Sequence, residues 1–131
     1  MPIIFDFKPE HKLVVCRQVG AVEDEEFISS YRSLFEGGRF DPPMDLVVDL
    51  RLADSSRRSQ DAIRDFAEYL KEWMRNTDKK SRIVVIAPQD VSFGLARMYE
   101  AYAESAHVDF TVFREADEAL EWLGVPADTL Q

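Results

Sequence analysis

The chain has 131 residues, of which 46% are hydrophobic and 31% are charged, and its formal net charge at pH 7 is −9. This composition predicts one globular domain, and the acidic balance argues against nucleic acid or an anionic membrane surface as a partner, because both favour clustered Lys and Arg. Cys16 is the only cysteine, which excludes an internal disulfide, and its place within an apolar run predicts a small buried side chain rather than a reactive thiol.

The N-terminal part of the chain predicts a β-hairpin followed by a helix. Residues 3–8 and 12–19 have strand patterns, and a turn at 9–11 joins them closely enough to make the pair antiparallel. An acidic cluster at 23–26 suits the first turn of a helix, and glycines 37–38 end it. Its buried stripe is expected to be Phe27, Ile28, Tyr31, Leu34 and Phe35.

The middle of the chain predicts a buried strand and the longest helix. The strand covers residues 45–50, and residues 51–58 read as a polar loop. Ser59 and Asp61 are suited to begin the helix that follows. Its apolar stripe is expected to be Ile63, Phe66, Ala67, Leu70, Trp73 and Met74.

Residues 82–102 predict a central strand–helix unit. The run 83–87 is apolar and rich in β-branched residues, which is typical of a strand buried on both faces, and Pro88 ends it. Asp90 is suited to cap the next helix. Two apolar lines predict that this helix packs on more than one side; they are Val91, Leu95, Met98 and Tyr102, and Phe93, Ala96, Tyr99 and Ala103.

The C-terminal part predicts a short strand at 109–113 and a last helix at 115–123, which Gly124 ends. The element order is therefore ββαβαβαβα. It predicts an α/β fold with one domain over residues 1–126, a mostly parallel five-stranded sheet, four helices and an antiparallel first strand at or near one edge. We expect the tail, residues 127–131, to be frayed.

The motifs that usually carry chemistry are missing from the sequence. No glycine lies in a nucleotide-binding or nucleophile-elbow motif, and neither His11 nor His107 has a second ligand at zinc spacing. We therefore predict no catalytic residue, no metal and no cofactor. Met1 leads into a strand pattern rather than a leader peptide, and no apolar stretch approaches the roughly 20 residues that cross a bilayer. We expect a cytoplasmic protein with no membrane span.

Polar side chains follow the two central strands, at the edge of the sheet where open α/β folds bind ligands. A serine ahead of a helix start could accept a phosphoryl group, favoured by exposed amides and by Arg57 or Arg58. The alternative is an ordinary polar loop. The residues concerned are Asp49, Arg51, Asp54, Ser55, Ser56 and Ser59 after the first strand, and Asp90, Ser92 and Phe93 after the second.

Arg97 interrupts an apolar helix, so it must reach solvent or a carboxylate such as Asp90, Asp109 or Glu100. The nearby aromatic side chains, with Tyr99 among them, either belong to the core or form a partner or dimer contact.

Three segments resemble a known protein group: Val-Val-Asp-Leu-Arg at 47–51, Phe-Gly-Leu-Ala-Arg-Met-Tyr-Glu at 93–100, and the run 112–124. With the element order, they resemble the small bacterial STAS-like (SpoIIAA-like) proteins, relatives of the anti-sigma-factor antagonists whose fold is shared in outline with lipid-carrying SEC14 domains. The resemblance implies a regulatory module with no enzymatic activity and a protein partner, such as a kinase-type anti-sigma regulator, or a second copy of itself. True antagonists carry a phosphorylated Asp-Ser-Ser-Gly motif. Asp54-Ser55-Ser56 matches its first three positions and Arg57 replaces the glycine, so a phosphoserine switch here would be degenerate.

Two functional hypotheses follow. The first is a protein-interaction module that uses the 51–59 loop, the helix after it and the helix at 91–104. This module could be a dimer. The second is a small apolar-ligand or lipid-binding domain of SEC14-like type. Its pocket is expected to be lined by Phe66, Trp73, Phe93, Met98, Tyr99 and Tyr102.

Overall fold

The computed structural model describes residues 2–77 and 79–130. Its strands are β1 (Ile3–Lys8), β2 (Leu13–Ala21), β3 (Asp45–Asp54), β4 (Ser81–Ile86) and β5 (Val108–Phe113). Its helices are α1 (Asp24–Glu36), α2 (Gln60–Met74), α3 (Asp90–Tyr102) and α4 (Ala116–Leu123), with short 3-10 turns η1 (Pro9–His11), η2 (Ser55–Arg57) and η3 (Ala127–Leu130). The predicted α/β order is confirmed. None of the described helices is long and apolar enough to cross a membrane.

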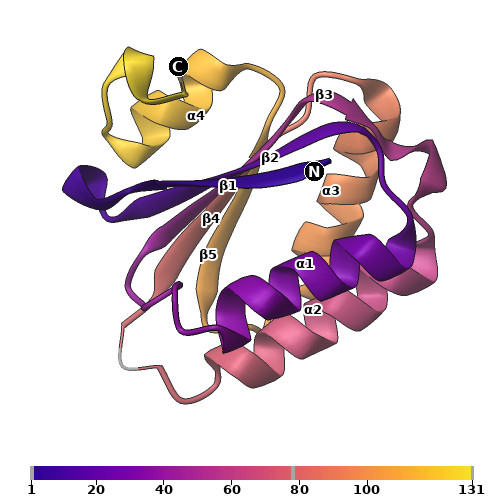
Figure 1. The fold of residues 1–131 in the computed structure, drawn as a ribbon, viewed down its shortest axis with the longest axis horizontal. Coiled ribbons are helices and arrows are strands. Elements are labelled where there is room, and N and C mark those ends of the chain that lie inside the picture. The colour runs from indigo at the N-terminus through magenta and orange to yellow at the C-terminus, as the bar shows by residue number, and fades with distance from the viewer. Residues whose placement is uncertain (1, 78, 131) are drawn as a thin grey trace.

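The five strands form one sheet in the order β1-β2-β3-β4-β5. β1 pairs antiparallel with β2 and lies at one edge, as predicted, and the other neighbouring strands are parallel. Helices α1, α2 and α3 cover one face of the sheet, and α4 with η3 covers the other (Figure 1). The carboxyl ends of β2, β3, β4 and β5 therefore meet at one edge of this three-layer arrangement.

Side-chain alternation along the strands fills two cores. Val14 and Cys16 belong to the larger core beneath α1, α2 and α3, whereas Leu13 and Val15 belong to the core beneath α4. Burial also raises the pKa of the Cys16 thiol. The thiol is therefore neutral, in agreement with its predicted role as a small buried side chain.

β3 is longer than predicted. Residues 51–54 were expected to form a loop, but Leu52, Ala53 and Asp54 pair with Val19, Gly20 and Ala21 of β2. A register shift between Arg17 and Val19 accommodates the pairing. The prediction was wrong because this segment pairs through its backbone with β2, which itself continues to Ala21, one residue beyond Gly20.

α3 differs from its prediction at its start and in its orientation. Gln89 is the N-cap residue, and the helix buries Ser92, Ala96 and Tyr99. Val91 is 60% exposed and Tyr102 is 38% exposed, so the first predicted apolar line is only partly covered. Two lines at helical spacing made both faces look apolar. Ala96 and Tyr99 of the second line are buried, whereas Leu95 and Met98 of the first line are only partly buried against the core.

The C-terminal tail was expected to be frayed, and over its described residues this is wrong. Thr129 and Leu130 are 5% and 7% exposed, and Leu130 packs in the core beneath α4. Arg17 also donates a hydrogen bond to the Leu130 carbonyl at 2.9 Å. The expectation for residue 131 lies outside the described residues.

The buried tail predicts a measurable contribution to stability. Leu130→Ala should lower the free energy of unfolding by about 2 kcal/mol, because it removes apolar contacts in the core beneath α4. Chemical denaturation would measure the change. Asp128→Ala, in the exposed part of the same turn, should shift it by less than about 0.5 kcal/mol. Equal effects of the two substitutions would contradict the packing of this tail.

Candidate functional site

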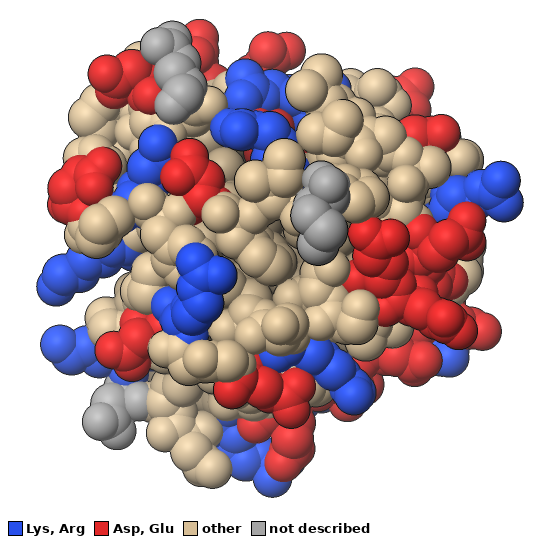
Figure 2. Space-filling model, viewed as in Figure 1, with Lys and Arg blue, Asp and Glu red and all other residues tan. Residues whose placement is uncertain are grey.

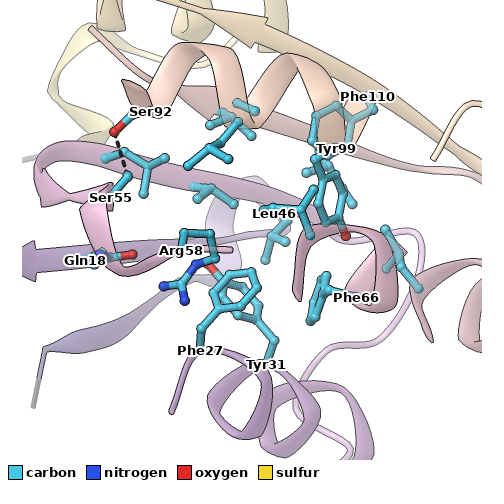
Figure 3. Close-up of a pocket in the computed structure, with 18 of the residues that line it drawn as sticks. Gln18, Phe27, Tyr31, Leu46, Ser55, Arg58, Phe66, Ser92, Tyr99 and Phe110 are labelled. Carbon is cyan, nitrogen blue, oxygen red and sulfur yellow. Dashed lines mark hydrogen bonds between the residues drawn. The ribbon is translucent and has the colours of Figure 1, made fainter. Parts of the chain in front are cut away.

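Two segments meet at the carboxyl edge of the sheet, and we call them together the rim: residues 54–59, which include η2, and residues 88–93, which include the first turn of α3. The Oγ atoms of Ser55 and Ser92 lie 2.6 Å apart and share a hydrogen bond between the segments (Figure 3). Ser92 is 1% exposed and Ser55 is half-buried. The structure thus brings together two serines from the two predicted groups.

Hydrogen bonds to backbone N–H groups fix Asp54 and Ser59, the polar residues on either side of η2. The Asp54 carboxylate accepts a hydrogen bond from the backbone N–H of Ser56 at 2.9 Å. The Ser59 hydroxyl accepts one from the backbone N–H of Ala62 at 3.0 Å and caps α2, as predicted. The side chains of Ser56 and Arg57 remain exposed. Ser56 is exposed, and its side chain neither caps α2 nor bonds Ser92. A hydrogen bond from its side chain instead helps to lower the pKa of the Asp54 carboxyl.

Arg58 ties the rim to the beginning of α1. Its side chain is 6% exposed, and its Nη1 lies 2.8 Å from Oδ1 of Asp24. Its guanidinium also lies over the Phe27 ring, 4.0 Å from the ring centroid. Burial raises the pKa of Asp24, but hydrogen bonds from Ser59 and Arg58 outweigh it and lower the pKa overall. Asp24 was interpreted from sequence only as part of an acidic first turn, and its contact with Arg58 was missed.

Asp49 and Arg51 belong to a separate ion-pair cluster. Asp49 is 2% exposed, and both of its carboxylate oxygens accept hydrogen bonds from the Arg51 guanidinium at 2.9 Å. Arg17 lies 3.4 Å from the same carboxylate and also bonds the Leu130 carbonyl. The cluster therefore lies on the sheet face that carries α4 and η3, whereas Ser55 bonds to α3 on the other face.

The remaining candidate residues on α3 have different surroundings. Asp90 was predicted to cap the helix, but its carboxylate instead accepts a hydrogen bond from Arg114 at 2.9 Å. The Arg114 guanidinium also lies 4.1 Å from the centroid of the half-buried Phe93 ring. Arg97 pairs with Glu100 at 3.3 Å in solvent, which confirms one of the partners considered from sequence.

A cavity of about 80 Å³ lies between the sheet and helices α1, α2 and α3 (Figure 3). Its walls are mainly apolar, and the aromatic lining side chains are Phe27, Tyr31, Phe35, Phe66, Tyr99 and Phe110. Its polar lining side chains are Gln18 of β2 and Ser55, Arg58 and Ser92 of the rim. Gln18 was not singled out in the sequence, since one amide within a strand carries no recognisable signal.

The predicted lining of this cavity was only partly right. Phe66 and Tyr99 line it, whereas Trp73, Phe93, Met98 and Tyr102 do not. From α3, Leu95, Ala96 and Tyr99 face the cavity. Phe93, in the first turn of the helix, lies under the Arg114 guanidinium instead. The side chain of Trp73 instead packs on the Phe35 and Phe40 rings, away from the rim.

The Asp49 cluster predicts a pH-dependent contribution to stability. Asp49→Asn should lower the free energy of unfolding at pH 7 by about 3 kcal/mol, because Arg17 and Arg51 lose a buried partner. Burial raises the pKa of Asp49, but hydrogen bonds from Arg51 lower it overall. The stabilisation is therefore complete above the unfolded pKa of about 3.9 and is lost as the pH falls through the lower folded value.

Denaturant titrations at pH 7 and near pH 3 would measure this difference, which should shrink at the lower pH. Asp109→Asn is a matched control, because that carboxylate lies 3.6 Å from Lys80 with 54% of its side chain exposed. It should change stability by no more than about 0.5 kcal/mol at either pH. A difference for Asp49→Asn that stays constant with pH would contradict the assignment.

Comparison with known proteins identifies the fold. No protein-family model and no curated protein matches the chain. Among solved structures, the chain is similar to an uncharacterized protein of the DUF3478 family with a SpoIIAA-like fold from Shewanella loihica PV-4. The two are 17% identical, with a TM-score of 0.55 over 92% of this chain and 91% of that chain. The predicted resemblance therefore holds at the level of the fold: the chain has a SpoIIAA-like, STAS-type fold.

Proposed function

We propose that the protein is a regulatory module of STAS type with no enzymatic activity, and that it binds a protein partner through the rim and the adjoining start of α1. The observation that carries this proposal is the combination of exposed apolar side chains with an acidic patch at this end of the molecule. We propose a partner with a basic surface that surrounds an apolar contact.

The apolar part of this surface comes from large hydrophobic side chains that are exposed. Leu52 is 64% exposed and Val91 is 60% exposed, and they lie beside η2 and in the first turn of α3. Val19, which is 43% exposed, pairs directly with Leu52 across the sheet. Exposed apolar residues that lie together are typical of contact surfaces.

The acidic part of the surface is the beginning of α1. Figure 2 shows acidic side chains gathered over this end of the helix, where Asp24, Glu25 and Glu26 form the first turn. The patch adjoins the rim, because Asp24 is paired with Arg58. Such a patch favours association with a basic partner and makes the association rate fall with added salt.

The serines of η2 support a finer proposal, a phosphoserine switch at Ser56. Ser56 is exposed and follows Asp54 and Ser55 in the motif-like segment, whereas the Ser55 hydroxyl is bonded to Ser92. A phosphate at Ser56 would add nearly two negative charges beside the acidic patch. It would strengthen the attraction for a basic partner and weaken binding to an acidic one.

The rim proposal can be tested by quantitative cross-linking and mass spectrometry of the tagged protein in its native cells. The double variant Leu52→Ser with Val91→Ser should reduce recovery of the partner about 5-fold or more, because it removes the two most exposed large apolar side chains of the surface. Recovery by the wild type should also fall between 0.1 and 0.5 M salt. Tyr102→Ser, at the other end of α3, is the matched control and should leave recovery unchanged. No enriched partner, or equal recovery with both variants, would overturn the proposal.

The switch can be tested by phosphopeptide mapping of the protein from the same cells. We predict that phosphate in this loop is carried by Ser56, so Ser56→Ala should abolish the phosphopeptide and Ser55→Ala should retain it. Phosphate on Ser55 alone, or an unmodified loop under all growth conditions, would count against the switch.

A further inference from the structure

Gly94 lies inside α3, at a position where the fold of a single chain does not require a glycine. Its backbone is helical, and a Cβ added to it would meet no atom within 4 Å beyond its own stretch of helix. Glycine is less favourable than alanine inside a helix, because it loses more conformational freedom on folding. A second backbone that packed against this position would, in contrast, need the side chain to be absent.

Gly94 is at the centre of the outward face of α3. Ser92, Ala96 and Tyr99 are the buried residues of the helix, and Figure 3 shows Ser92 and Tyr99 on the side that faces the cavity. Successive residues of a helix are rotated by about 100°, which places Gly94 on the opposite side. Gly94 is exposed there, so another molecule can reach its backbone.

Four side chains surround Gly94 on this outward face. Asp90 and Val91 lie one turn before it, and Arg97 and Met98 lie one turn after it. The Asp90 and Arg97 side chains are 94% and 62% exposed, and Val91 is 60% exposed. Helical spacing puts the two charged residues on one side of Gly94 and the two apolar residues on the other.

This pattern is complementary to a second copy of itself. In an antiparallel pair of α3 helices related by a two-fold axis at Gly94, each residue before the glycine faces a residue after it in the other copy. Asp90 then faces Arg97 of the second copy, and Val91 faces Met98 of the second copy. Each contact occurs twice, and the two helices approach closely at the glycine between them.

The two charged side chains are available for contacts between copies. Within the chain, Asp90 lies 2.9 Å from Arg114, and Arg97 lies 3.3 Å from Glu100. Because Asp90 and Arg97 are mostly exposed, these pairs contribute little to the stability of the single chain. A second copy can therefore replace them at little cost.

We propose that the protein forms a homodimer in which the α3 helices of two copies pack antiparallel across Gly94. One pair of helices buries less surface than a standard interface, so the dimer is weak, with a dissociation constant on the order of 10 to 100 µM. The dimer does not depend on the partner of the proposed function. Because it covers Val91, which belongs to the rim, it competes with that partner for part of the same surface.

Sedimentation equilibrium of the purified full-length protein, at concentrations below and above this range, should show a monomer–dimer equilibrium. Asp90→Arg and Arg97→Asp should each weaken the dimer about 10-fold or more, because each places like charges opposite one another. An equimolar mixture of these two variants should restore association, because opposite charges then face each other at both ends of the contact. Circular dichroism would check that both variants are folded.

Glu72→Arg and Arg75→Glu provide the matched control. They reverse an exposed ion pair near the end of α2, and neither the single variants nor their mixture should depart from the wild-type dissociation constant. A wild type that stays monomeric, or a mixture of the α3 variants that stays monomeric, would overturn the proposal. Because the measurement uses purified protein alone, such a failure would leave the proposed partner surface intact.

Gly94→Gln tests the close approach directly. It should weaken the dimer about 10-fold or more, because the new side chain keeps the helices apart. The melting temperature of the dilute monomer should stay the same or rise, since glutamine is more favourable than glycine inside a helix. A melting temperature several degrees lower would show that the fold itself requires Gly94, and would overturn the proposal, as would an unchanged dissociation constant.

Discussion

The ion pair between Arg58 and Asp24 is the contact on which this end of the molecule depends. It joins the residue that precedes the α2 cap to the first turn of α1, 34 positions away in the chain. The same guanidinium covers the Phe27 ring, so one side chain fixes the rim, one wall of the cavity and the acidic patch. Breaking the pair would leave a nearly buried guanidinium without its counter-charge, which is far more costly than losing a surface ion pair.

The hydrogen bond between Ser55 and Ser92 adds a second constraint at the rim. Because Ser92 is almost fully buried, turning Ser55 outward would leave its hydroxyl unpaired, at a cost of about 1 to 3 kcal/mol. Ser55 therefore remains directed toward α3, and Ser56 next to it remains in solvent. Two adjacent serines with the same chemistry thus have different accessibility, for a reason that lies in another segment of the chain.

Much of the fold could be predicted from the sequence, because burial follows from local periodicity. The alternation in Leu13, Val14 and Val15 and the β-branched run before Pro88 are properties of a few neighbouring residues, and the structure confirms the strands there. The end of β3 and the tail could not be predicted in this way. Their order depends on distant contacts, namely backbone pairing of Leu52 with Val19 and burial of Leu130 under α4.

The site shows the same division between local and distant causes. That Ser55 and Ser92 would come close follows from parallel strands ending at one edge, and no geometry beyond the order of elements is needed. Their sharing of a hydrogen bond, and the contact of Arg58 with Asp24, depend on side-chain positions that no local pattern encodes. The cavity lining was partly wrong because a helix with two apolar lines leaves its rotation undetermined until it meets the sheet.

The rim and the cavity place opposite demands on a binding partner. The rim and the adjoining start of α1 offer exposed apolar side chains beside an acidic first turn, which suit a large, complementary surface in water. The cavity is small and mainly apolar, and Arg58, the one charged side chain among its described lining residues, is paired with Asp24. The fold is compatible with either kind of site, and only the side chains decide between them. Because the two sites meet only at Ser55, Arg58 and Ser92, occupation of one need not require occupation of the other.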